Sequence, residues 1–197
     1  MLNHRLPKQP LTMCPDGSLN HLMVNSLLLN QQDPLLNQSQ VSGATLVSRK
    51  ALILLLNQLC HPRAGSVRDF LTHFDNEAPA DNAVLELYAN RFTAIIKTAR
   101  GGGAWLGGSD FQQALSHYWQ SIRTLTISGG LTSHLFGLHL AERVESHFTD
   151  LDVISSPWGG LTALFGLAQT VAQYDDLLVM DFGATGVKRA IARKYGN

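Results

Sequence analysis

The chain has 197 residues, of which 45% are hydrophobic and 15% are charged, and its formal net charge is zero at pH 7. This length suffices for one domain with a substantial core, or for one domain with a small appendage. A neutral chain lacks the positive field that attracts a polyanion, so we expect no nucleic-acid partner. No 18 apolar residues follow one another, so we also expect no membrane partner.

The two cysteines, Cys14 and Cys60, lie far apart in the sequence and form no CxxC pair. They predict neither a disulfide framework nor a metal site, as is usual for a reduced cytoplasmic protein. The first residues also lack the apolar core of a secretory signal. These features together predict a cytoplasmic protein.

Residues 1–40 are predicted to form an irregular segment, because they are rich in amides and interrupted by prolines. Leu22–Leu29 is the one apolar piece and is short enough to be a strand. The amide side chains are of a kind that hydrogen-bonds a polyhydroxylated ligand, although a polar surface loop has the same composition.

Apolar periodicity then predicts four helices, over residues 47–59, 66–74, 80–100 and 111–123. Pro62 ends the first helix, because the residue before a proline disfavours the α region. Ser66 is placed to cap the second helix and Gly101 to end the third. The glycine-rich stretch 101–108 lacks the G-K-[ST] ending of a P-loop and follows no strand, so we interpret it as a connection between helices.

The stretch Leu125–Val144 is the one around which the chain is organised. A short apolar run is followed by Gly129-Gly130 and then by a helical pattern, which predicts a strand, a glycine turn and a helix. Two glycines let the backbone approach a ligand closely, and Thr132 or Ser133 is placed to cap the helix. The free N–H groups of such a helix start can receive phosphate or ribose oxygens. An ordinary strand-to-helix connection has the same pattern.

The helix predicted after this turn carries its apolar residues at helical spacing. Three leucines fall on one stripe and three further apolar residues lie beside it: Leu131, Leu135 and Leu138, then Phe136, Leu140 and Val144. Further along, the sequence predicts a strand at 152–156, a turn at 157–160 and a helix at 161–174. It ends in a β-hairpin with its turn at Gly183–Gly186.

The hairpin sequence Asp181-Phe-Gly-Ala-Thr-Gly-Val-Lys188 resembles the first phosphate motif of the actin-like ATPase superfamily, in the D-x-G-x-T-x-x-K form of sugar kinases. An Asp at a strand end can hold hydrated Mg²⁺, and a glycine-lined hairpin turn offers N–H groups to phosphate oxygens. A lysine adds a positive point charge.

A second motif, Ile127-Ser-Gly-Gly-Leu-Thr132, resembles the adenosine motif of the same superfamily, in which the glycine pair lies against the nucleotide. Ser42-Gly43 with its following helix, and the segment Ser156–Leu167, resemble parts of the closing half of the ROK (repressor, ORF, kinase) sugar kinases. The resemblance covers residues 40–175 as one continuous half, together with the terminal hairpin.

This resemblance implies an α/β fold, namely the carboxyl half of an actin-like (ribonuclease H-like) ATPase with a small mixed sheet packed with helices. It implies an N-terminal segment 1–40, a nucleotide-binding half at 41–175 and a phosphate-motif-like hairpin at 176–197. In the complete family, ATP passes its terminal phosphoryl group to a sugar hydroxyl. ATP and Mg²⁺ are therefore the implied cofactors, and a nucleotide and a sugar are the implied partners. The residues implied to bind the nucleotide are Gly129, Gly130, Thr132, Asp181, Gly183, Thr185 and Lys188, with Asp181 as the metal ligand.

The order of the motifs departs from that of the family. In the family the phosphate hairpin begins the chain and the adenosine motif comes late, whereas here the hairpin follows the adenosine motif. The middle piece that supplies the general base has no counterpart, nor does the family's zinc-binding His/Cys cluster. Truncation, circular permutation, a fusion boundary or a minimised protein would each give this order. We therefore expect weak nucleotide binding and poor phosphoryl transfer, and the sequence identifies no catalytic base.

The remaining titratable side chains predict ordinary structural roles. His134 and His139 are spaced so that they do not share a helical face. Asp75, Asp110 and Asp150 lie at helix ends, where capping accounts for them.

A different class of function stays open, namely a non-catalytic regulatory or protein-interaction module that keeps the actin-like scaffold. Half of a two-domain kinase exposes an apolar inter-domain face, which also predicts a homodimer. The kinase hypothesis makes one demand that the interaction hypothesis does not. It requires Asp181 and Gly129-Gly130 to face the same cleft.

Overall fold

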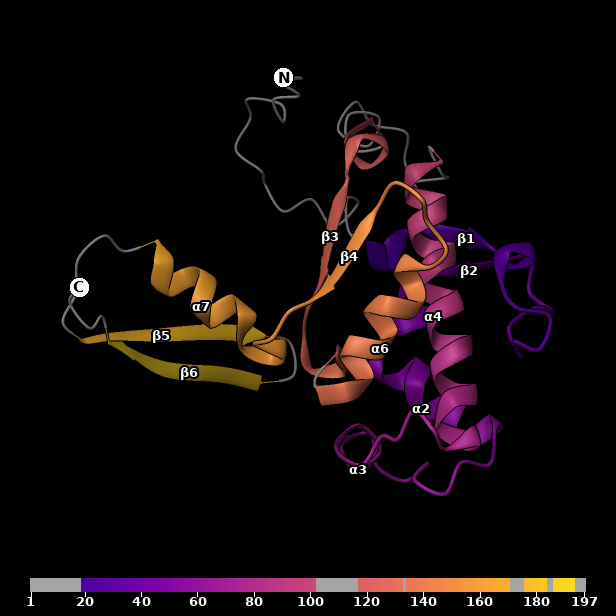
Figure 1. The fold of residues 1–197 in the computed structure, drawn as a ribbon, viewed down its shortest axis with the longest axis horizontal. Helices are drawn as coiled ribbons and strands as arrows, with labels where there is room; N and C mark the ends of the chain where they lie inside the picture. The colour runs from indigo at the N-terminus through magenta and orange to yellow at the C-terminus, as the bar shows by residue number, and fades with distance from the viewer. Residues whose placement is uncertain (1–18, 102–116, 133, 171–175, 184–185, 194–197) are drawn as a thin grey trace.

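The computed structural model describes residues 19–101, 117–132, 134–170, 176–183 and 186–193. It has a mixed α/β fold, in which helices pack with small two-stranded sheets (Figure 1). β1 and β2 pair antiparallel, β3 and β4 pair parallel, and β5 and β6 form an antiparallel hairpin. The strands are β1 Met23–Asn25, β2 Gln40–Ser42, β3 Thr124–Ile127, β4 Asp152–Ser155, β5 Asp176–Gly183 and β6 Gly186–Arg193. The expectation of an α/β fold is confirmed, whereas the expected single mixed sheet is not formed in the described residues, whose strands pair two by two.

The described helices are α1 Gly43–Val47, α2 Arg49–Gln58, α3 Val67–Thr72, α4 Pro79–Arg100, α6 His134–Glu145 and α7 Thr162–Gln169. Short 3-10 turns are η2 Leu19–His21, η3 Ser26–Leu28, η4 Gly130–Thr132 and η5 Gly159–Leu161. None of the helices that the structure describes combines the length and the apolar character that a membrane span requires.

Local signals in the sequence set several of these boundaries. The hydroxyl of Ser66 accepts a hydrogen bond from the backbone N–H of Asp69 at 3.2 Å and caps α3 as expected. The predicted long helix is confirmed as α4, and the N–H of Gly101 closes it by donating to the carbonyl of Lys97. The predicted hairpin is also confirmed, since Gly183 pairs with Gly186 beside its turn.

Two other boundaries differ from the prediction because a polar side chain caps a new turn. The helix predicted over 47–59 corresponds to α2 and begins at Arg49, because the hydroxyl of Ser48 accepts from the N–H of Ala51, and the separate helix α1 precedes it. The strand predicted over 22–29 stops at Asn25, whose side chain accepts from the N–H of Leu27 and starts η3. Parts of the helices predicted at 111–123 and 161–174, and most of the connection at 101–108, lie outside the described residues.

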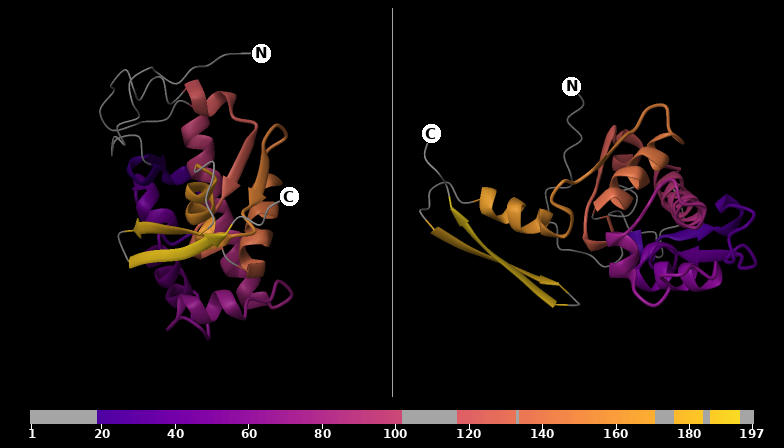
Figure 2. Two further views of the ribbon diagram at one scale, coloured as in Figure 1. Left: turned by 90° about the vertical axis from the view of Figure 1, so that its left-hand side faces the viewer. Right: turned by 60° about the horizontal axis from the view of Figure 1, so that its bottom comes forward.

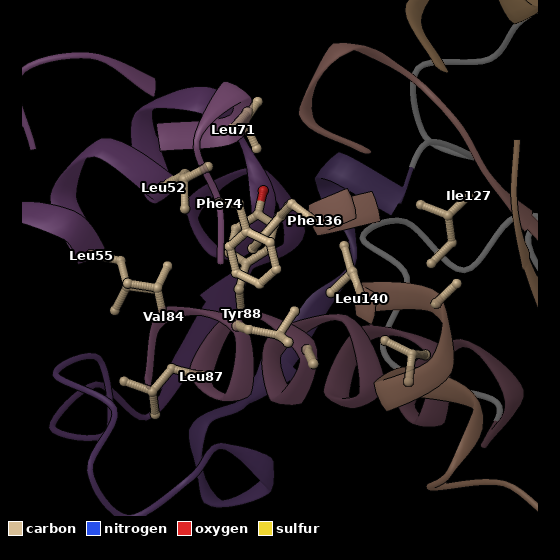
Figure 3. Close-up of a cluster of buried hydrophobic side chains, with 14 of the residues drawn as sticks. Leu52, Leu55, Leu71, Phe74, Val84, Leu87, Tyr88, Ile127, Phe136 and Leu140 are labelled. Carbon is tan, nitrogen blue, oxygen red and sulfur yellow. The ribbon is translucent and has the colours of Figure 1, made fainter. Parts of the chain in front are cut away.

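The main core lies between α4, α6 and the β3–β4 sheet. Phe136 of α6 contacts the rings of Phe70, Phe74 and Tyr88 with centroids 5.2 to 5.9 Å apart. Figure 3 shows Phe74, Tyr88 and Phe136 among leucines of α2, α3 and α4. The sheet presents Ile127 and Val153 to this core, whereas Ile154 on its other face is exposed.

The segment before residue 40 is anchored to the helices by a buried ion pair. Nε and Nη2 of Arg91 in α4 donate to the two carboxylate oxygens of Asp33 at 2.7 and 3.0 Å, and both side chains are buried. Leu22 and Val24 pack beside Ile95 of the same helix. The division of the chain at residue 40 stays a prediction, and the described part of this segment, from residue 19 on, is packed against α4.

The last elements form a separate layer, here called the hairpin unit and consisting of α7, β5 and β6. α7 covers one face of the hairpin through Leu164 and Ala168, which pack against Val179. Figures 1 and 2 show the unit beside the rest of the molecule, with the turn end of the hairpin directed toward it. The rest of the described chain, residues 19–161, is called the body below.

Candidate functional site

The candidate site lies where the two parallel strands end. β3 and β4 are joined through α6 and pair from Thr124 with Asp152 to Ile127 with Ser155. Their carboxyl ends therefore meet at one edge, where open α/β sheets bind their ligands. Each strand leads into a turn that contains two glycines, Gly129-Gly130 after β3 and Gly159-Gly160 after β4.

These two turns are joined to one another. The N–H of Gly129 donates to the carbonyl of Gly159 at 3.1 Å. Gly129 has a φ of +115° and Gly159 a φ of +48°, which are left-handed conformations that glycine adopts without strain. The hydroxyl of Thr132 donates to the carbonyl of Gly129 at 3.1 Å and so braces the turn. Ser133, the other predicted cap, lies outside the described residues.

A third glycine sets how α6 leaves this turn. A β-carbon on Gly137 would overlap the carbonyl group of Thr132, so only glycine fits there. The close approach turns Phe136, Leu140 and Val144 into the core. Leu135 and Leu138 then point outward and are 56% and 49% exposed.

Beside the two turns lies a cavity of about 640 Å³, a volume typical of small-molecule sites. The turn after β4 lines it with Ser156, Trp158 and Gly160. Its other wall is the start of α6 with the preceding turn, through Thr132, His134, Leu135 and Leu138. His134 has an exposed side chain and a φ of +61°, an uncommon conformation for a residue with a side chain.

The hairpin brings a charged pair close to Gly160, although neither member of the pair is among the residues that line this cavity. Asp181 and Lys188 are partners across β5 and β6, and Nζ of Lys188 lies 3.7 Å from Oδ2 of Asp181. A β-carbon built on Gly160 would lie 3.7 Å from the same Nζ and 3.6 Å from the Cα of Gly130. Gly130, Gly160 and the Asp181–Lys188 pair are thus gathered in one place.

The structure therefore brings together most of the residues predicted to bind a nucleotide. Gly129, Gly130 and Thr132 form the first turn, Gly160 of the second turn lies beside Gly130, and Lys188 with its partner Asp181 reaches Gly160 from the hairpin. The buried hydroxyl of Thr132 is engaged by its own turn. Gly183 ends β5 opposite Gly186, and Thr185 lies outside the described residues.

The apolar residues that line the cavity are not evident as site residues from the sequence. The sequence predicts Trp158 only as part of a turn, and Leu135 and Leu138 only as part of a helical stripe. The available signal was the tryptophan in the Pro-Trp-Gly-Gly turn, because a large side chain in such a turn has little core to pack against and stays partly exposed. In the structure the Trp158 ring stacks on Phe165, with centroids 3.8 Å apart and an angle of 28° between the planes.

Other titratable groups are engaged in structural pairs. Asp150 accepts hydrogen bonds from Arg100 at 2.9 and 2.6 Å and does not act as a cap. The hydrogen bond from Arg100 holds the pKa of the Asp150 carboxyl below its usual range. Asp75 accepts from the N–H of Glu77 in the turn before α4 and does not cap that helix, whose N-cap is Ala78, and Asp110 lies outside the described residues.

A buried histidine that the sequence analysis did not single out also has a structural pair. Nε2 of His61 lies 2.7 Å from Oδ1 of Asp81, and the N–H of Arg63 donates to its Nδ1. Since Nδ1 accepts, Nε2 carries the proton and donates to the carboxylate. His61 is not among the residues that line the cavity.

Among the described residues no three or more His, Cys, Asp or Glu side chains are grouped so as to hold a metal ion by themselves. A magnesium ion bound with a nucleotide needs fewer protein ligands, because phosphate oxygens and water complete its octahedron around one or two carboxylates. Asp181 fits that lesser demand. Comparisons of the chain with protein-family models, curated proteins and solved structures found no match.

Proposed function

We propose that the cavity at the ends of β3 and β4 binds Mg·ATP, and that the chain is the nucleotide-binding module of a ROK-like sugar kinase with an actin-like fold. One observation carries the proposal. Lys188, from the phosphate-like motif, lies close to Gly160, and Gly160 lies close to Gly130 of the adenosine-like motif, although the hairpin is far along the chain from both turns. Asp181 pairs with this lysine, which supports a shared site for the two motifs.

The groups at this place suit a polyphosphate. Gly130 and Gly160 have no side chain that would keep a ligand from the backbone. The Lys188 ammonium supplies positive charge beside them, and the positive end of the α6 dipole faces the same turn. Asp181 would hold hydrated Mg²⁺ that bridges phosphate oxygens, and the ion would neutralise charge on the transferred group.

Transfer to a sugar hydroxyl is the activity of the complete family that the resemblance implies. It requires a group that accepts the hydroxyl proton. His134 is the titratable side chain among the described residues that line the cavity, and we assign it no role in transfer. The proposal for this chain is therefore nucleotide binding.

A protein-interaction module, including a homodimer, is the second candidate function. The face of the hairpin opposite α7 carries a row of exposed apolar side chains, which is typical of interaction surfaces. They are Leu178, Met180, Val187 and Ile191. This face needs no nucleotide, so the two candidates can be tested separately.

A thermal-shift titration with Mg·ATP tests the first candidate. A ligand that binds only the folded state raises the melting temperature as its concentration rises. We expect such a rise in the wild type and a smaller rise in Asp181→Ala and Lys188→Ala. The matched control is Asp176→Ala at the far end of β5, whose carboxylate pairs with Arg193 away from the turn. It is expected to behave as the wild type.

Two results would contradict nucleotide binding at this place. One is a melting temperature that does not change at millimolar Mg·ATP, which would leave the interaction module as the working function. The other is an equal rise in all four proteins, which would place the nucleotide elsewhere.

A further inference from the structure

The outward side of α6 is apolar, although it does not face the core of the described structure. Leu135 and Leu138 are about half exposed, while Phe136 and Leu140 of the same helix fill the core. Both exposed leucines line the cavity beside the glycine turns. Exposed apolar side chains gathered in one concave place are typical of a ligand site.

The turn after β4 adds an aromatic ring to the apolar lining of this cavity. Trp158 is 51% exposed and lines the same cavity. Phe165 of α7 stacks against its ring, so the indole is held in place before any ligand arrives. A fixed indole at the edge of a cavity offers a flat surface for another planar ring.

The lining of the cavity therefore has two chemically different parts. Trp158, Leu135 and Leu138 supply an apolar and aromatic surface. Gly160 is the lining residue that the Lys188 ammonium approaches. A ligand that uses both parts has a planar apolar ring and an anionic group, which describes a nucleotide better than an inorganic polyphosphate or a free sugar.

We propose that Trp158, together with Leu135 and Leu138, forms the subsite for the nucleotide base, and that the base stacks on the indole while the phosphates lie toward Lys188. This inference rests on the proposed function, because it takes the ligand to be a nucleotide. In this inference, the side chains that select a nucleotide lie outside both motifs of the resemblance.

Isothermal titration calorimetry with two probes tests the subsite. The probes are Mg·ATP and Mg·tripolyphosphate, which share the phosphates and differ in the nucleoside. Loss of base stacking on an aromatic side chain weakens binding roughly tenfold. We expect Trp158→Ala to weaken Mg·ATP by about that factor and to leave Mg·tripolyphosphate unchanged, whereas Trp158→Phe keeps most of the affinity.

Further variants separate a binding effect from a folding effect. Leu138→Ala changes another exposed apolar side chain that lines the cavity. We expect it to weaken the binding of Mg·ATP several-fold and to leave the binding of Mg·tripolyphosphate unchanged. Lys188→Ala is expected to weaken both probes. Leu161→Ala is the control, because Leu161 is 49% exposed, close to Trp158 in sequence, and not among the residues that line the cavity.

The outcomes distinguish this inference from the proposed function. Mg·ATP that binds equally well to the wild type, Trp158→Ala and Leu138→Ala would overturn the base subsite and leave nucleotide binding intact. Equal losses for the two probes in Trp158→Ala would also overturn it, because the indole would then act on the phosphates or on the fold. No binding of Mg·ATP to the wild type would overturn both.

Discussion

The body and the hairpin unit differ in how completely they bury their apolar side chains. In the body, α4 and α6 close over a large core in which Tyr88 and Phe136 have no exposed surface. Among its described residues, the hairpin unit has three buried core residues, Leu164, Ala168 and Val179. On the open face of its hairpin, Leu178 is 62% exposed and Ile191 is 73% exposed.

This difference in burial indicates that the body and the hairpin unit are stabilised to different degrees by their own cores. The body has enough buried apolar surface to fold by itself. A two-stranded hairpin covered by one helix is marginal in isolation. Its turn end contacts the body where Lys188 lies against Gly160, which is the candidate site. A ligand held at that site would therefore stabilise the hairpin unit more than the body.

Removing a core aromatic of the body should have the largest effect. Phe136→Ala deletes a fully buried ring that contacts three other aromatic rings, and we expect it to lower the free energy of unfolding by about 3–5 kcal/mol. Leu135→Ala, one residue earlier and exposed, is expected to change it by less than about 0.5 kcal/mol. Urea denaturation measures both. Similar losses in the two variants would contradict the described orientation of α6, in which Phe136 faces the core and Leu135 faces outward.

Ion pairs provide the next contrast between the regions. Asp33→Ala leaves Arg91 buried without its partner, and we expect a loss of about 3 kcal/mol. Asp176→Ala removes an exposed pair with Arg193 in the hairpin unit, for which about 0–1 kcal/mol is expected. Chemical denaturation of the two variants measures the difference. A loss for Asp176→Ala as large as that for Asp33→Ala would show that the hairpin unit is more firmly built than its burial indicates.

Within the hairpin unit, the two faces of β5 should respond differently. Val179→Ala shortens a buried side chain under α7 and is expected to cost about 1.5 kcal/mol if the unit unfolds with the body. Leu178→Ala alters the open face and is expected to leave the melting temperature nearly unchanged. If Leu178→Ala lowers the melting temperature in a concentration-dependent way, that face is covered by a partner copy, as the homodimer proposal requires.

The smallest expected effect is the dependence of stability on acid. Arg100 lowers the pKa of Asp150 in the folded body, so this pair stabilises the folded state above the ordinary pKa of an aspartate, about 4. The stabilisation disappears as the pH falls through the lower pKa of the folded state. Denaturation midpoints measured from pH 6 down to pH 2 should therefore fall less steeply in Asp150→Asn than in the wild type. Parallel curves would contradict the pairing.

Elements with local signals could be predicted from the sequence, whereas their orientation could not. Ser66 and Gly101 act on their own neighbours along the chain, and the helix ends that they mark were predicted correctly. The two stripes of α6 are both apolar, so periodicity does not reveal which one faces the core. The contact of Gly137 with Thr132 decides it, and that contact exists only once strand, turn and helix have packed.

The residues of the candidate site also divide into those that could be predicted from the sequence and those that could not. Gly129, Gly130, Asp181 and Lys188 carry their chemistry in short motifs, so they could be named in advance. Trp158 gains its place from stacking on Phe165 in the next helix and from lying opposite α6 across the cavity, which no spacing in the sequence encodes.

The most direct test of the account is hydrogen exchange with and without Mg·ATP. Exchange reports local opening, so it follows each region separately. We expect slower exchange on adding Mg·ATP at the turn residues 128–132 and 158–161 and along the turn-end half of the hairpin. The amides of α4 should not change. Unchanged exchange in the turns and the hairpin at saturating Mg·ATP would contradict a nucleotide site between the two regions.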